Sequence, residues 1–102
     1  MRKFTCPPAR ENALVKAELG FTQAIARMNI SAEASTVLVG LASDVIDAAL
    51  SAESTAAAGL PAPSAPFNAA KTLPEWVAYD IDRARRSWDR FYAEVSRAMR
   101  IR

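Results

Sequence analysis

The sequence contains no histidine and only one cysteine, Cys6, among its 102 residues. Without histidine, the chain cannot form a Ser-His-Asp triad, a Cys-His pair or a histidine-rich zinc site. A single cysteine cannot form an intramolecular disulfide or a cysteine cluster for a metal ion. We therefore expect no catalytic residues, no cofactor and no metal site, and we interpret Cys6 as incidental.

Glycine is also scarce, at three residues, whereas alanine occurs 22 times. Sheet proteins usually carry more turn residues and more β-branched runs. Alanine has the highest helix propensity and lets helices approach closely. The composition therefore predicts an all-α protein. A chain of this length favours one domain, here residues 1–102, with residues 1–7 as a flexible arm and residues 60–71 as a proline-rich connector.

Long hydrophobic runs are missing as well. The most apolar stretch, residues 37–50, contains Asp44 and Asp47 and is shorter than the roughly 20 residues that span a bilayer. Near the start, Pro7 and Pro8 come before any apolar run that could belong to a signal peptide. We expect a cytoplasmic protein that keeps its thiol reduced and does not associate with a membrane.

Apolar residues recur at helical spacing in three segments, residues 8–28, 32–58 and 73–100. Ser31 is a candidate N-cap of the second helix, and Thr72 with Glu75 fits a capping box before the third. The third segment has a heptad-like apolar seam that includes Trp88. The pattern predicts an antiparallel three-helix bundle, with completion by dimerisation as an open alternative.

Charge is distributed unevenly along the chain. Residues 1–30 carry five basic and two acidic residues, residues 31–70 carry four acidic and no basic residues, and residues 71–102 carry eight basic and five acidic residues. An acidic central helix between two basic ones suggests electrostatic pairing, either within the bundle or across a dimer.

The candidate partner-binding surface is a ridge on the third predicted helix, opposite its apolar seam. Arginine offers a planar fork for carboxylate or phosphate, and tyrosine and arginine are common interface anchors. The alternative is an ordinary solvated face, because Asp82, Asp89 and Glu94 can pair with neighbouring arginines. This Arg ridge consists of Trp76, Tyr79, Arg83, Arg86, Arg90 and Arg97.

A second, narrower apolar stripe on the first predicted helix consists of Val15, Leu19 and Ala26. One interpretation is contact with the third helix inside the bundle. The other is an interface between subunits, which makes these three residues candidates for a homodimer contact.

By elimination, the sequence predicts a small non-enzymatic protein-interaction module that acts as a regulator, adaptor or inhibitor of a larger protein with an acidic surface. The alternative is a nucleic-acid-binding regulator that uses the Arg ridge for phosphate contacts. The acidic residues among the arginines disfavour that alternative, and the second predicted helix is too acidic for a recognition helix. An enzyme would have to rely on tyrosine, lysine or carboxylates alone.

Overall fold

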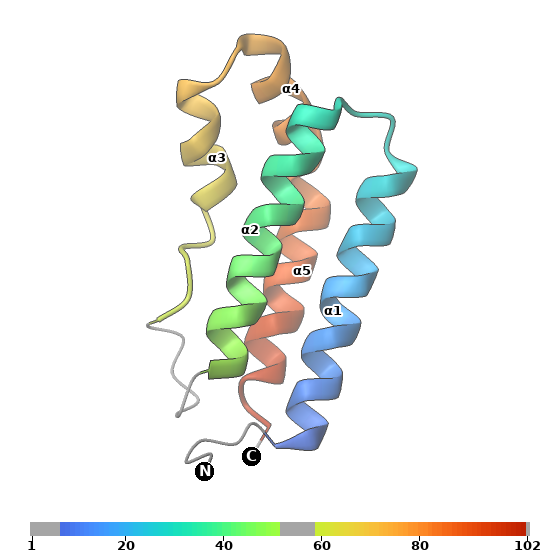
Figure 1. Ribbon diagram of the computed structural model, residues 1–102, viewed down its shortest axis with the longest axis vertical. Helices are drawn as coiled ribbons and strands as arrows, with labels where there is room; N and C mark the ends of the chain where they lie inside the picture. Colours follow the sequence, from blue (N-terminus) through green and yellow to red (C-terminus); the bar gives the residue numbers. More distant parts are fainter. Residues whose placement is uncertain (1–6, 52–58, 102) are drawn as a thin grey trace.

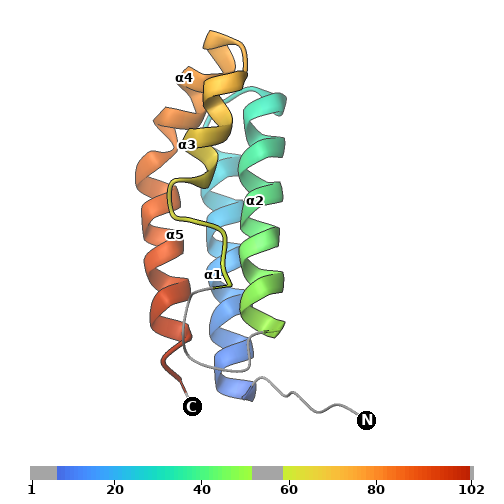
Figure 2. The same cartoon turned by 90° about the vertical axis from the view of Figure 1, so that its left-hand side faces the viewer.

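The computed structural model describes residues 7–51 and 59–101, and within those ranges the secondary structure is helical. The described residues form five α-helices, α1 (Pro8–Arg27), α2 (Ala32–Ser51), α3 (Ala65–Ala69), α4 (Glu75–Arg83) and α5 (Arg85–Ala98), with a 3₁₀ turn at Ala70–Thr72. The helices α1, α2 and α5 lie side by side, and α3 and α4 occupy one end next to α2 (Figures 1 and 2). The prediction of an all-α protein is confirmed, whereas a count of three helices is not.

The first two helices begin where the sequence predicts. Pro8 occupies the first position of α1, where its missing N–H costs no hydrogen bond. Ser31 caps α2, because its Oγ accepts a hydrogen bond of 3.2 Å from the N–H of Ala34. The described part of α2 ends at Ser51. Its predicted continuation through residues 52–58 lies outside the described residues, as do residues 1–6 of the predicted arm.

The third predicted helix is two helices. It breaks at Ala84, which has φ −89° and ψ 6°, and the Ala84 N–H bonds to the carbonyl of Ile81 three residues back. This residue is fully buried. No glycine or proline marks the break, and the apolar seam runs through it, so nothing in the residue pattern indicates it.

The capping box predicted for this segment does not form. The helix α4 begins at Glu75 after Pro74, without a side-chain cap. The hydroxyl of Thr72 instead donates to the carbonyl of Ala69, at 3.1 Å. The reason is that the connector is itself helical from Ala65 to Thr72, so Thr72 closes one short turn rather than opening the next helix.

The connector is held to the bundle by two aromatic side chains of α5. The indole Nε1 of Trp88 donates to the carbonyl of Pro63, at 2.7 Å, and the hydroxyl of Tyr92 donates to the carbonyl of Pro61, also at 2.7 Å. Pro61 and Pro63 precede α3 and lie outside the helices, so no helical hydrogen bond uses their carbonyls. On the connector, Phe67 is half-buried and the guanidinium of Arg85 lies 3.8 Å from its ring centroid, a cation–π contact.

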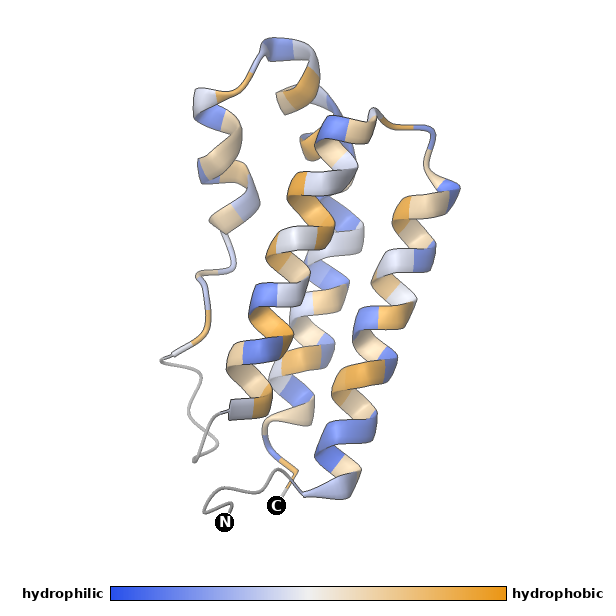
Figure 3. Cartoon of the chain, in the orientation of Figure 1, coloured by the Kyte–Doolittle hydropathy of each residue, from blue (hydrophilic) through white to orange (hydrophobic). Residues whose placement is uncertain are grey.

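The core is one cluster of side chains from α1, α2, α4 and α5. At its centre Phe21 of α1 packs against Trp88 and Phe91 of α5, with ring centroids 5.6 Å and 5.0 Å away. All three rings are 3% exposed or less. The hydropathy pattern in Figure 3 shows apolar and polar bands alternating along each long helix, as an amphipathic arrangement requires.

Candidate functional site

A groove runs along the surface between α1 and α5, which are packed together over their length. It has two hollows, of about 500 Å³ near the α1–α2 turn and about 620 Å³ towards the opposite end. Gly20 and Glu94 line both hollows, so the two form one continuous groove. We call it the α1/α5 groove.

The floor of the α1/α5 groove is made of small side chains. Gly20 is exposed, and a Cβ added to it would meet no atom within 4 Å. The aromatic residues Phe21 and Phe91 also line the groove but are only 3% and 2% exposed. The floor is therefore shallow and apolar without offering an aromatic face. Its small residues are Ala13, Ala17, Gly20, Ala24 and Ala98.

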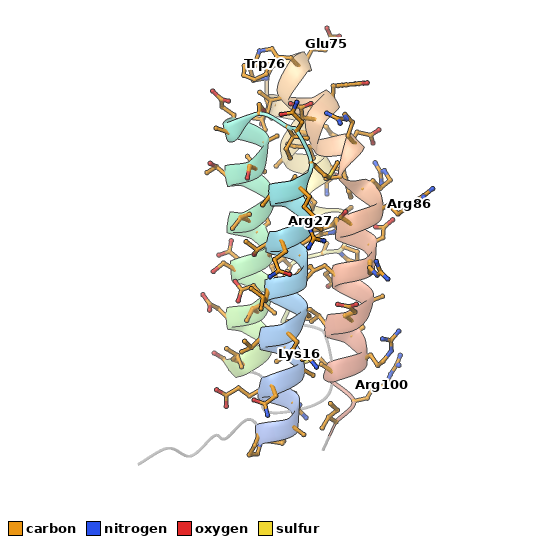
Figure 4. All side chains as sticks on the ribbon, turned by 90° about the vertical axis from the view of Figure 1, so that its right-hand side faces the viewer. Lys16, Arg27, Glu75, Trp76, Arg86 and Arg100 are labelled. Atoms are coloured by element: carbon orange, nitrogen blue, oxygen red, sulfur yellow. The ribbon has the colours of Figure 1, made fainter. Side chains whose placement is uncertain are left out.

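The walls of the groove are basic. Glu94 is the single acidic residue among the described residues that line it, and its Oε2 lies 4.0 Å from Nε of Arg90. The Arg90 side chain is nevertheless 84% exposed, so its guanidinium remains open to a second partner. Figure 4 looks onto α1, with α5 beside it, and labels Lys16, Arg27 and Arg86. The five basic lining residues are Lys16, Arg27, Arg86, Arg90 and Arg97.

The structure divides the predicted Arg ridge into two parts. Three of its members line the groove, namely Arg86, Arg90 and Arg97. The other three do not line it. Arg83 Nη1 donates to the carbonyl of Asn29 and contacts Asp80 Oδ1, both at 3.4 Å, so Arg83 lies against the α1–α2 turn.

Tyr79 and Trp76 are 68% and 55% exposed, and Trp76 lies at one end of the molecule (Figure 4). Both aromatic side chains belong to α4, on the far side of the helix break from the groove residues of α5. They are therefore exposed aromatic side chains outside the groove.

Sequence reasoning missed the α1 wall of the groove. Lys16, Gly20 and Arg27 are not among the site residues that the sequence predicts. A signal was available, because these three residues fall within about 40° on a helical projection at 100° per residue. The sequence does not show, however, that this face of the first helix lies next to α5.

The stripe of Val15, Leu19 and Ala26 lies outside both hollows of the groove. Val15 and Leu19 are 51% and 55% exposed, and Ala26 is exposed too. The interpretation of these residues as contacts with the third helix therefore does not account for them. Their assignment to a subunit interface stays a prediction.

The acidic residues of α2, Glu33, Asp44 and Asp47, are all exposed. Three ion pairs occur within residues 7–51 and 59–101, Arg83–Asp80, Arg85–Asp82 and Arg90–Glu94, and α2 contributes to none of them. The predicted pairing of α2 with its basic neighbours inside the bundle is therefore not seen in the described part of the chain.

By length and composition alone, α2 could cross a membrane, with a mean hydropathy of 1.4 in its most apolar window. Six of its side chains are buried in the core. A helix that packs in the core of a protein can have the same hydropathy as a helix that crosses a membrane. Asp44 and Asp47 are exposed on its outer face, where contact with lipid would be costly.

Comparison with known protein families, with curated proteins and with solved structures gives no significant match. In the described residues, no group of three or more Cys, Asp or Glu side chains lies close enough together to hold a metal ion. The α1/α5 groove is therefore the candidate functional site.

Proposed function

We propose that this protein is a small, non-enzymatic and cytoplasmic protein-interaction module that regulates, adapts or inhibits a larger protein. Its docking surface is the α1/α5 groove, and the partner presents an acidic surface to it. One observation carries the proposal: basic side chains from two helices, far apart in sequence, line the same groove over a floor of small residues.

Complementary charge of this kind raises the association rate and selects partners more than it adds affinity. Affinity then depends on contact with the floor. Because Gly20 leaves that floor open, the backbone of a partner can approach closely.

Nucleic acid is the rival ligand, and the five basic groove residues favour it. Four acidic residues among the arginines disfavour it, Asp80, Asp82, Asp89 and Glu94. Two of them bond to local partners, Asp80 to the Ser31 N–H and Asp82 to Arg85. The floor argues for protein. Base stacking needs exposed aromatic faces, whereas Phe21 and Phe91 are buried under the groove. A phosphate backbone gains little from small apolar side chains.

The experiment is affinity capture from native extract, followed by identification of the captured partner and titration with it. Arg86→Glu together with Arg90→Glu reverses two charges on the α5 wall and should abolish binding while leaving the thermal unfolding curve unchanged. This pair is preferable to Arg83, which bonds to the α1–α2 turn. Lys71→Glu is the control, because Lys71 is an exposed basic residue outside the groove.

Affinity that survives the double reversal would disprove the groove as the docking surface. A gel-shift titration with duplex and single-stranded DNA and RNA at several salt concentrations decides between the two ligands. Binding at about 50–100 mM salt that weakens steeply as salt rises would replace the protein proposal with the nucleic-acid one.

A further inference from the structure

The exposed face of α2 is an acidic stripe with a glycine in its middle. Glu33, Gly40, Asp44 and Asp47 are all exposed, and a Cβ on Gly40, as on Gly20, would meet no atom within 4 Å. We call these four residues the acidic stripe. Its charge is opposite to that of the α1/α5 groove, and both surfaces carry an unfilled glycine.

The residue spacing of the two surfaces matches in the antiparallel sense. On α1, Lys16, Gly20 and Arg27 are separated by four and then seven residues. On α2, read backwards, Asp44, Gly40 and Glu33 are also separated by four and then seven residues. At 1.5 Å per residue, the outer charges on each helix are about 16 Å apart. Laid antiparallel, the two helices bring both charge pairs and both glycines to the same heights.

The other wall of the groove has the same spacing. Arg86 and Arg97 are eleven residues apart (97 minus 86). Arg86 lines the hollow that contains Arg27, and Arg97 lines the hollow that contains Lys16. An acidic residue at either height would therefore meet two cations, one from each wall.

Glu94 occupies the remaining height. It lines both hollows together with Gly20. It would thus face the neutral middle of the acidic stripe, around Gly40, rather than either outer carboxylate. The groove's own acid and the acids of the stripe do not oppose one another.

We propose that the α1/α5 groove receives the acidic stripe of a second copy of this chain. The α2 helix of the second copy lies antiparallel to α1, with its Gly40 over Gly20. Its Asp44 lies between Lys16 and Arg97, and its Glu33 between Arg27 and Arg86. The two glycines allow the helix backbones to approach more closely than larger side chains would permit.

The assembly has a defined geometry. Within one chain α2 already runs antiparallel to α1 (Figure 1), so the second copy stands parallel to the first. Counting from the α1–α2 turn, Lys16 and Asp44 lie eleven and twelve residues away (27 minus 16, 44 minus 32). Copies therefore associate side by side with little axial shift. Groove and stripe are different surfaces, so the contact is heterologous and builds a ring or an open row rather than a two-fold dimer.

This self-association uses the groove of the proposed function but does not depend on that function. A partner and a second copy would compete for one site, so self-association would withhold the groove from the partner. Because the test needs no partner, its failure leaves the docking proposal standing.

The test is sedimentation velocity of the full chain over a concentration series up to about 1 mM, the weak end of measurable affinity. We expect the sedimentation coefficient to rise with concentration at about 0.1 M salt. At about 1 M salt, where the Debye length falls to about 3 Å, we expect that rise to be lost. A chain that stays monomeric throughout at the lower salt overturns the proposal.

Charge reversal separates this contact from any other. Lys16→Glu with Arg27→Glu reverses the α1 wall, and Glu33→Lys with Asp44→Lys reverses the stripe. Each variant alone should stay monomeric, because the first sets acidic residues of the α1 wall against the acidic stripe and the second sets a basic stripe against the basic groove. An equimolar mixture should form a complex again, since the unaltered groove of the stripe variant then meets the unaltered acidic stripe of the groove variant. Failure of the mixture to associate overturns the proposal.

The apolar stripe on α1 supplies the matched control. Val15→Ser with Leu19→Ser removes exposed apolar surface outside the groove and should leave association unchanged. Gly20→Phe adds a bulky side chain to the groove floor, at a position where the Cβ itself meets no atom within 4 Å, and should abolish association. The reverse outcome, loss with the serine variant and not with Gly20→Phe, would place the interface on Val15 and Leu19 and overturn the groove. Circular dichroism checks that each variant is folded.

Discussion

The side chain of Asp80 on α4 holds the first turn of α2, because its Oδ2 accepts a hydrogen bond of 2.9 Å from the backbone N–H of Ser31. Ser31 in turn caps α2 through its own hydroxyl. Asp80 also lies 3.4 Å from Arg83, which reaches the carbonyl of Asn29. One carboxylate thus ties the α1–α2 turn to α4.

This contact predicts a pH dependence. The hydrogen bond from the Ser31 N–H, followed by smaller contributions from the Ser31 hydroxyl and Arg83, lowers the pKa of Asp80 below its ordinary value of 3.8 despite partial desolvation. A lowered folded-state pKa means that the contribution is present above about pH 4 and is lost as pH falls through the folded-state pKa. Asp80→Ala should therefore lower the melting temperature at pH 7, and the difference from wild type should shrink by pH 2. A difference independent of pH would show that the charge of Asp80 contributes nothing.

Trp88 should be the most sensitive core position. It is fully buried, packs on Phe21 and Phe91 and donates to Pro63. Trp88→Ala should cost about 3–5 kcal/mol of unfolding free energy, measured by urea denaturation. Trp88→Phe should cost less than Trp88→Ala because it keeps an aromatic ring in the core, although it leaves the Pro63 carbonyl without its donor. A loss below about 1 kcal/mol for Trp88→Ala would contradict the assigned core.

Replacement of either exposed helical glycine should stabilise the fold. Gly20 and Gly40 lie inside helices, neither has a positive φ, and a Cβ on either would meet nothing within 4 Å. Gly20→Ala and Gly40→Ala should each raise the unfolding free energy by about 0.8–1 kcal/mol through helix propensity. Thermal unfolding under conditions that keep the chain monomeric measures this, and destabilisation by either alanine would indicate a contact that the structure lacks.

Arg10 joins the start of α1 to the residues that follow α5, at one end of the bundle. It is only 5% exposed, and its Nε and Nη2 both donate to the carbonyl of Ile101, at 3.0 Å and 2.7 Å. Arg10→Met keeps most of the packing and removes both hydrogen bonds, so it should cost about 1.5–3 kcal/mol. Hydrogen exchange should show faster opening of the last turn of α5. Unchanged exchange there would mean that Arg10 does not hold this end.

Much of the fold could be predicted from local pattern. Helix starts at Pro8 and after Ser31 follow from one residue's backbone and capping preferences, and the buried seam around Trp88 follows from spacing. Thr72 shows the limit of such reasoning. Thr72 and Glu75 have the spacing of a capping box, but the preceding segment forms its own short helix, and the Thr72 hydroxyl donates to the Ala69 carbonyl there.

The candidate site was predicted only in part for a similar reason. Arg86, Arg90 and Arg97 could be placed together because one helix carries them. Lys16 and Arg27 could not be joined to them, since that requires knowing which face of the first helix borders the last. Arg83 was grouped with the ridge, although the turn at Asn29 holds it elsewhere.

By itself the sequence determined the helical class, the residues that face the core and the alternation of basic, acidic and basic segments, because helical periodicity and charge are local properties of the chain. Only the tertiary structure decided that two basic segments share one groove, that Gly20 lies open on its floor, and that α2 keeps its carboxylates on the outside. Those relationships depend on how the helices are packed, because the sequence of one helix does not show which of its faces the neighbouring helices leave exposed.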